Sequence, residues 1–149
     1  MTGQLPVFSY KATPTGRVIQ EGNAFASSVI LMIETREAIK KVDEIAAVDG
    51  IDVLLIGSND LSIELGGPGD MRNPVFRSAL EAVSTACQRH GETMGLAGVY
   101  DNYELQNWAV NTLCVRFMVC HVDSGLIASG ALRCVATVPK IEEGNSKGG

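Results

Sequence analysis

Apolar residues occur in short continuous runs along the central part of this chain, and between the runs they recur at helical spacing. The run 29–33 is rich in β-branched side chains, which predicts a strand buried on both faces. From residue 39 to residue 46 the apolar positions follow the helical period, until Asp49 and Gly50 end the helix. The pattern therefore predicts a strand followed by a helix.

Three further strand and helix pairs follow in the sequence. Their predicted bounds are strand 51–56 with helix 74–90, strand 93–97 with helix 102–111, and strand 115–119 with a helix of about 124–132. Four consecutive βα units with short links predict an α/β fold whose parallel strands are joined by right-handed crossovers. Either an open doubly wound sheet or part of a (β/α)8 barrel satisfies this pattern.

The chain length separates a complete barrel from a partial one. A complete (β/α)8 barrel typically needs about 250 residues, and this chain has 149, so a barrel would be present only as a half. We expect three parts: an irregular arm over 1–24 with at most a short helix, a half-barrel domain over 25–141, and a flexible tail over 142–149.

Composition narrows the possible partners and locations. The chain is 46% hydrophobic and 19% charged, which excludes a disordered protein. Its net charge of -5 and the lack of clustered Lys or Arg argue against nucleic acid or a membrane surface as partner. Without a signal peptide or a long apolar segment, we expect a cytoplasmic protein whose four cysteines are reduced and mostly buried.

Two of the predicted strands lead into carboxylates. Glu34 directly follows the first strand, and Asp60 follows the second strand after Gly57, Ser58 and Asn59. Because the carboxyl ends of parallel strands meet at one edge of a sheet, the two acids can hold a hard divalent cation such as Mg²⁺ or Mn²⁺. Each acid can equally cap the helix or turn that follows it, and the spacing leaves both interpretations open.

The loop from Gly57 to Ser62 also has two interpretations. If a helix starts within it, its backbone N–H groups can bind a carboxylate or phosphate. It can also be an ordinary strand-to-helix turn that Asn59 or Asp60 caps.

Three segments carry a resemblance to a known family. They are 32–38 (MIETREA), 42–48 (VDEIAAV) and 50–62 (GIDVLLIGSNDLS). In residues, order and spacing they resemble the HpcH/HpaI family of class II pyruvate aldolases, and the resemblance extends more weakly to about residue 135. It implies a (β/α)8 TIM barrel of which this chain supplies strands five to eight.

The resemblance also implies a site and a function. It makes Glu34 and Asp60 the ligands of Mg²⁺ or Mn²⁺, and it places the carboxylate of pyruvate or oxaloacetate on the backbone of Gly57, Ser58, Asn59 and Asp60. Ser58 stands where the family more usually has proline. The implied activity is that of a metal-dependent carbon–carbon lyase, an aldolase or decarboxylase that stabilises the enolate of a 2-keto acid.

The resemblance implies that the catalytic His and substrate-binding Arg of the family come from the first half of the barrel, which no segment here matches. His121 follows the fourth strand on the active edge, which makes it the candidate proton carrier, although a lone His is more often structural. The alternatives are a truncated, non-catalytic relative that binds a metal, a small acid or a protein partner, and a secondary-metabolism enzyme with a different reaction. Because half a barrel leaves two edges unpaired, we expect a homo-oligomer in which two copies close eight strands, or an arm 1–24 that covers an edge.

Overall fold

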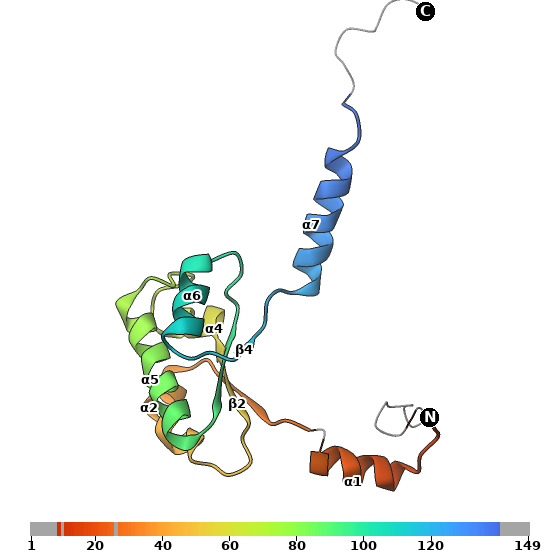
Figure 1. Cartoon of the computed structure of the whole chain (residues 1–149). Helices are drawn as coiled ribbons and strands as arrows, with labels where there is room; N and C mark the ends of the chain where they lie inside the picture. The colour runs from red at the N-terminus through yellow and green to blue at the C-terminus, as the bar shows by residue number, and fades with distance from the viewer. Residues whose placement is uncertain (1–8, 10, 26, 141–149) are drawn as a thin grey trace, which may run out of the picture.

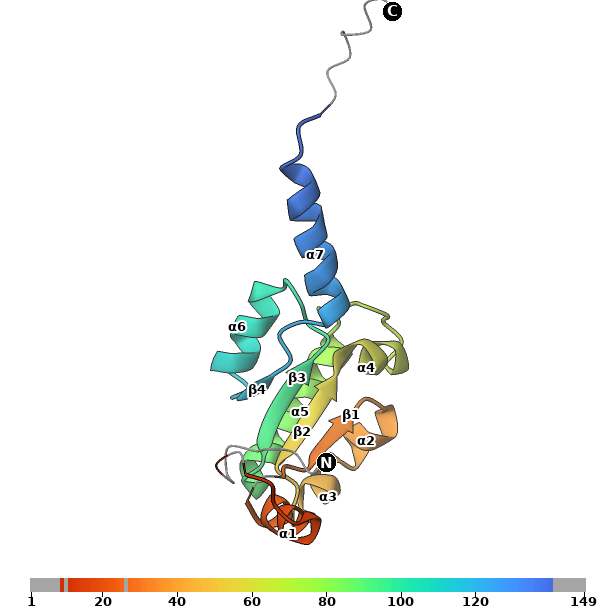
Figure 2. The ribbon, with the colours of Figure 1, turned by 90° about the vertical axis from the view of Figure 1, so that its right-hand side faces the viewer.

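Four parallel strands form one sheet, in the same order in space as in the sequence (Figures 1 and 2). The computed structural model describes residues 9, 11–25 and 27–140, so the predicted tail 142–149 lies outside the described residues. The strands are β1 (Ile30–Ile33), β2 (Val53–Gly57), β3 (Thr93–Ala97) and β4 (Phe117–Met118). The helices are α1 (Thr15–Phe25), α2 (Arg36–Lys40), α3 (Val42–Ala46), α4 (Ser58–Glu64), α5 (Pro74–His90), α6 (Tyr103–Asn111) and α7 (Asp123–Ala136).

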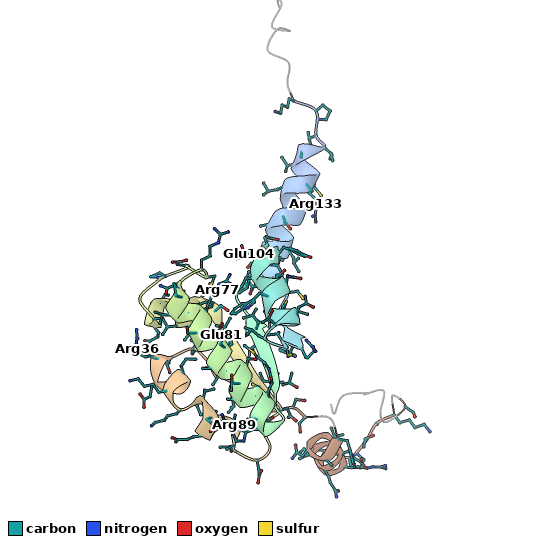
Figure 3. The ribbon with its side chains drawn as sticks, turned by 60° about the vertical axis from the view of Figure 1, so that its left-hand side comes forward. Arg36, Arg77, Glu81, Arg89, Glu104 and Arg133 are labelled. Atoms are coloured by element: carbon teal, nitrogen blue, oxygen red, sulfur yellow. The ribbon has the colours of Figure 1, made fainter. Side chains whose placement is uncertain are left out.

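Helices cover one face of the sheet, and we call this face the outer face. Its central residues, Leu54, Ile56 and Leu96, are at most 1% exposed, and α5 packs directly behind them (Figure 2). Between α5 and α6, Arg77 lies 3.2 Å from Glu104 and stacks over the ring of Trp108 (Figure 3). The hydrophobic core of the described residues therefore lies between the sheet and these helices.

Among the described residues, no helix packs along the other face, here called the inner face (Figures 1 and 2). Gly95 lies at its centre, and a methyl group built on Gly95 would lie 2.9 Å from Leu55 Cδ1 and 3.1 Å from Val53 Cγ1. Leu55 and Val53 therefore bend over the glycine and are buried. At the edges of the face, the side chains of Met32 and Phe117 remain 53% and 37% exposed.

The predicted α/β fold with parallel βα units is confirmed, and the predicted bounds of β3 and of α5 are correct. The expectation that the first strand is buried on both faces is wrong. In β1 only Ile33 is buried, because β1 is an edge strand whose inner face is uncovered. β4 is also shorter than the predicted strand 115–119.

Two predicted helical segments differ in length. The helix predicted after β1 is interrupted at Lys41 and forms α2 and α3. Within the arm predicted over 1–24, α1 is an 11-residue helix rather than at most a short one. Pro14 begins it by accepting hydrogen bonds from the N–H groups of Arg17 and Val18. Gly16 and Gly22 obscured its helical pattern in the sequence.

The helices α1 and α7 lie at the surface of the protein. Neither α1 nor α7 contributes a buried residue, and α7 extends away from the sheet (Figure 1).

Of the four cysteines only Cys87 is buried, so the expectation of mostly buried thiols is wrong. In the described residues, no helix combines the length and the apolar character that a membrane span needs.

Candidate functional site

A cavity of about 160 Å³ lies at the carboxyl end of the central strands. This volume suits a small acid better than a drug-sized ligand, whose pockets measure roughly 300–1,000 Å³. The cavity is lined by Met32, Gly57, Ser58, Asn59, Asp60, Ala97, Gly98 and Tyr100. The four residues predicted to bind substrate, 57–60, therefore line one cavity together with residues from β1 and β3.

Glu34 lies beside this cavity and packs against Gly57. A methyl group built on Gly57 would lie 3.0 Å from Glu34 Oε2 and 3.1 Å from Glu34 Cβ. The glycine thus leaves the space in which the Glu34 carboxylate sits next to the start of α4. Asp60 is an exposed residue of the first turn of α4 and lines the same cavity.

The helix-capping interpretation of the two acids finds no support in the hydrogen bonds. Thr35, not Glu34, caps α2, because its Oγ1 accepts a hydrogen bond of 3.1 Å from the N–H of Ala38. At α4 the cap residue is Gly57, and no side chain makes a capping hydrogen bond there. The first backbone N–H groups of α4 are therefore open to a ligand at the cavity.

Ser58 is the most unusual polar group of the cavity. It is fully buried, and its Oγ makes no hydrogen bond within the described structure. Leaving a buried hydroxyl without a partner costs about 1–3 kcal/mol. A carboxylate bound at the start of α4 would give this hydroxyl an acceptor.

The carboxylates of Glu34 and Asp60, with the space that Gly57 leaves beside Glu34, fit a divalent cation that the protein would hold only in part. Oxygen ligands suit Mg²⁺ and Mn²⁺, which usually keep several positions for water or substrate oxygens. The described residues contain no group of three or more His, Cys, Asp or Glu side chains that could hold a metal ion. Within the described part of the chain, Glu34 and Asp60 are the two carboxylates at the cavity that such a cation would use, and its other positions would go to substrate and solvent.

His121 lies next to the cavity but does not line it. Its ring stacks on Tyr100 with centroids 5.0 Å apart and an angle of 9° between the planes. The other histidine, His90, ends α5 at the opposite end of the sheet, where its Nε2 lies 3.1 Å from Asp43. The sequence correctly assigns only His121 to the edge that carries the cavity.

The sequence analysis missed four residues that line the cavity. It treated Met32 and Ala97 as parts of strands, and it predicted no function for Gly98 and Tyr100 in the turn after β3. The position of Tyr100 just past the end of a predicted parallel strand was the signal that could have identified it.

Comparisons with known proteins identify relatives of this chain. Residues 10–110 match the family model of HpcH/HpaI aldolase/citrate lyase. Over 142 residues the chain is 51% identical to a 4-hydroxy-4-methyl-2-oxoglutarate aldolase of Chaetomium globosum, covering 95% of this chain and 53% of that one. An enzyme of the same name from Hapsidospora irregularis is 49% identical with the same coverage. The chain thus spans about half the length of these curated relatives.

Solved structures agree with the fold. An HpcH/HpaI aldolase from Desulfitobacterium hafniense superposes with a TM-score of 0.72 at 25% identity, covering 93% of this chain and 52% of that one. Macrophomate synthase superposes with a TM-score of 0.59 at 22% identity, covering 85% of this chain and 44% of that one. This coverage confirms that the four βα units make up half of a TIM barrel. Which half they form stays a prediction.

Proposed function

Because this chain belongs to the HpcH/HpaI aldolase/citrate lyase family, we propose that it carries the metal- and substrate-binding half of a carbon–carbon lyase. The proposed substrate is a 2-keto acid, and the reaction is aldol cleavage or decarboxylation to the enolate of pyruvate. The names of the two fungal relatives make 4-hydroxy-2-oxo acids the first substrates to test.

Glu34 and Asp60 are the proposed ligands of Mg²⁺ or Mn²⁺. The observation that carries the proposal is the packing of Glu34 Oε2 against Gly57, beside the cavity that Asp60 lines. When bound, a divalent cation supplies Lewis acidity that stabilises negative charge on the keto acid.

The start of α4 is the proposed site for the carboxylate of the keto acid. The first N–H groups of α4, around Ser58, Asn59 and Asp60, have no capping side chain, and the Ser58 hydroxyl has no partner in the described structure. Together they can donate hydrogen bonds to a carboxylate and hold it in one orientation.

In aldol cleavage the bond between carbons 3 and 4 breaks, its electron pair stays on carbon 3, and the hydroxyl on carbon 4 loses its proton as it becomes a carbonyl. Protonation of carbon 3 then gives pyruvate. Both proton transfers need a carrier, and the catalytic role of His121 stays a prediction, because His121 stacks on Tyr100 and is not among the residues that line the cavity.

Metal binding is the first test. Mn²⁺ titrated calorimetrically into the chain should bind, and Glu34→Gln and Asp60→Asn should each weaken binding at least about tenfold by removing a charged ligand. Glu37→Gln is the matched control, because Glu37 is an exposed acid on α2 that pairs with Lys41. Equal affinities in all four proteins would refute the assignment.

Exchange of the pyruvate methyl protons separates a catalyst from a non-catalytic relative. An active site that forms the enolate exchanges these protons for deuterium in heavy water, which NMR measures directly. One observation favours the non-catalytic alternative: the residues of the described structure that line the cavity include no His, Lys or Arg. Mn²⁺ binding without exchange would support this alternative.

A second copy of the chain is the proposed partner. β1 and β4 are the two edge strands of the sheet, and Ile30, Met32 and Phe117 leave apolar surface on the inner face. Two copies would supply the eight strands of a barrel. Light scattering should then give twice the 15.8 kDa mass of one chain, whereas a stable monomer would refute the proposal. The cytoplasmic location expected from the sequence also stays a prediction.

A further inference from the structure

Tyr100 is placed on the β3 side of the cavity by a fixed turn. The carbonyl of Val99 accepts a hydrogen bond of 3.0 Å from Gln106 Nε2, and Asn102 caps α6 through the N–H of Leu105. These contacts hold the backbone on both sides of Tyr100, which lines the cavity.

His121 stacks on the ring of Tyr100 and is not among the residues that line the cavity. Its Nδ1 accepts a hydrogen bond of 2.9 Å from the N–H of Val122. Behind it lies Gly125 in the first turn of α7. A methyl group built on Gly125 would clash with His121 Cε1, so a larger residue at 125 would displace the ring.

We propose that Tyr100 is a specificity-determining residue that hydrogen-bonds the hydroxyl on carbon 4 of a 4-hydroxy-2-oxo acid, and that His121 positions its ring. This inference rests on the proposed function, which assigns the carboxylate end of the substrate to the start of α4. The rest of the substrate must then extend toward another part of the cavity wall.

The chemistry of that wall favours Tyr100. Met32 on the β1 side offers a thioether, which is a weak acceptor and no donor. Tyr100 offers a hydroxyl that both donates and accepts, so it can partner the carbon-4 hydroxyl. A site built to bond a substrate hydroxyl discriminates strongly against the analogue that lacks it, because the polar group of the site is left unpaired.

Three ligands of increasing size test the role of Tyr100 with the Mn²⁺-loaded chain. They are oxalate, which lacks carbon 4, 2-oxoglutarate, which lacks the hydroxyl, and 4-hydroxy-2-oxoglutarate. In calorimetric titrations, Tyr100→Phe should weaken 4-hydroxy-2-oxoglutarate about fivefold, as expected for one lost hydrogen bond. It should leave the oxalate affinity unchanged and should not weaken 2-oxoglutarate, because the unpaired Tyr100 hydroxyl that disfavours this ligand is gone. Tyr103→Phe is the matched control: Tyr103 is 79% exposed on α6, is not among the residues that line the cavity, and its change should leave the preference for the hydroxylated ligand as it is.

The positioning role of His121 needs variants that separate the shape of its ring from its proton. His121→Phe keeps an aromatic ring on Tyr100 and should preserve the preference for 4-hydroxy-2-oxoglutarate, whereas His121→Ala should lose it. Gly125→Ala should act like His121→Ala by displacing the ring. Gly130→Ala, in the same helix and with nothing within 4 Å of the added methyl group, should have no effect.

The outcomes distinguish the two levels of the proposal. A chain that does not bind Mn²⁺ would overturn both the proposed function and this inference. Normal Mn²⁺ and oxalate binding with an unchanged hydroxyl preference in Tyr100→Phe would overturn the inference alone. If His121→Phe lost as much as His121→Ala, the imidazole itself would act, and the positioning role would be wrong.

Discussion

The outer and inner faces of the sheet differ in what holds their side chains. On the outer face, Leu54 and Ile56 are fully buried under the helices. On the inner face, Ile30 and Met32 are 42% and 53% exposed, and the burial of Leu55 depends on a glycine in the neighbouring strand. The same four strands therefore present a closed core on one face and an open apolar surface on the other.

Within one sheet, the outer face contributes most of the stability of the fold, and the inner face carries the candidate site. The candidate site lies where the inner face meets the carboxyl ends of the strands, and its residues contribute little to the helix-covered core. Substitutions at the site should therefore change binding more than folding, and substitutions under the helices should do the opposite. The predictions that follow test this division.

The largest expected change in the free energy of unfolding is for a substitution on the outer face. Leu54→Ala removes a side chain that is 0% exposed and leaves a cavity, which should lower the free energy of unfolding by about 2–5 kcal/mol. Met32→Ala is the matched change on the inner face, and because Met32 is 53% exposed it should cost about 0.5 kcal/mol. Urea denaturation measures both. Equal losses would mean that the inner face is covered in solution and would break the comparison.

Cys87 tests how well the helix layer shields a nucleophile. Burial, followed by the charge of Glu92, raises the pKa of the Cys87 thiol from 9.0 to about 11. At pH 8 the folded protein should then contain about 100-fold less Cys87 thiolate than an unshifted thiol would provide. A thiol reagent should modify the exposed Cys114, Cys120 and Cys134 and spare Cys87 until the protein unfolds.

The sign of the pH effect follows from the same shift. Because the folded pKa of Cys87 lies above its unfolded value, this thiol leaves the free energy of unfolding unchanged below pH 9 and lowers it as the pH rises from 9 toward 11. Cys87→Ser should remove part of that alkaline loss. Rapid labelling of Cys87 at pH 8 in urea-free buffer would contradict the shielding.

The sequence predicted the parts of the fold that depend on local patterns. The helix α5 follows from Pro74 at its first position and from Gly91, whose φ of +82° ends it in the left-handed region. Glu34 and Asp60 were predicted to lie at one edge, because the ends of parallel strands meet there. What the pattern of residues 29–33 could not show is that β1 is an edge strand, since an apolar run is the same at an edge and in the middle of a sheet.

The sequence predicted only those site residues whose position follows from the end of a strand. Tyr100 and Gly125 acquire their roles from contacts between distant segments. Tyr100 meets His121 across the turn that follows β3, and Gly125 leaves room for the His121 ring. No pattern of tyrosine or glycine positions in the sequence reveals such a contact.

At the site, Gly57→Ala should reduce the affinity for Mn²⁺ although it substitutes neither of the proposed ligands. The φ of Gly57 is −85°, so alanine fits the backbone, but its methyl group would lie 3.0 Å from Glu34 Oε2 and push the carboxylate aside. Mn²⁺ affinity should fall about tenfold, as for a lost ligand. Because the methyl group would also lie 3.1 Å from Glu34 Cβ, which the backbone holds in place, the free energy of unfolding should fall by about 1 kcal/mol. Gly22→Ala in α1, whose methyl group would meet nothing within 4 Å, is the control. A loss of stability without loss of Mn²⁺ affinity would contradict the division of roles.

The smallest expected effect has opposite signs for folding and for binding. Ser58→Ala removes a buried hydroxyl that has no partner in the described structure, so the ligand-free chain should gain up to about 1 kcal/mol in urea denaturation. The same change should weaken oxalate binding to the Mn²⁺-loaded chain about threefold, because the carboxylate loses one donor. Ser62 in the same helix is the matched control, since its Oγ donates to the Asn59 carbonyl at 2.7 Å and accepts from the N–H of Gly69 at 2.9 Å. Ser62→Ala should therefore cost about 1–2 kcal/mol. If Ser58→Ala were as costly as Ser62→Ala, the Ser58 hydroxyl would already be satisfied without ligand, and its role in holding the carboxylate would be refuted.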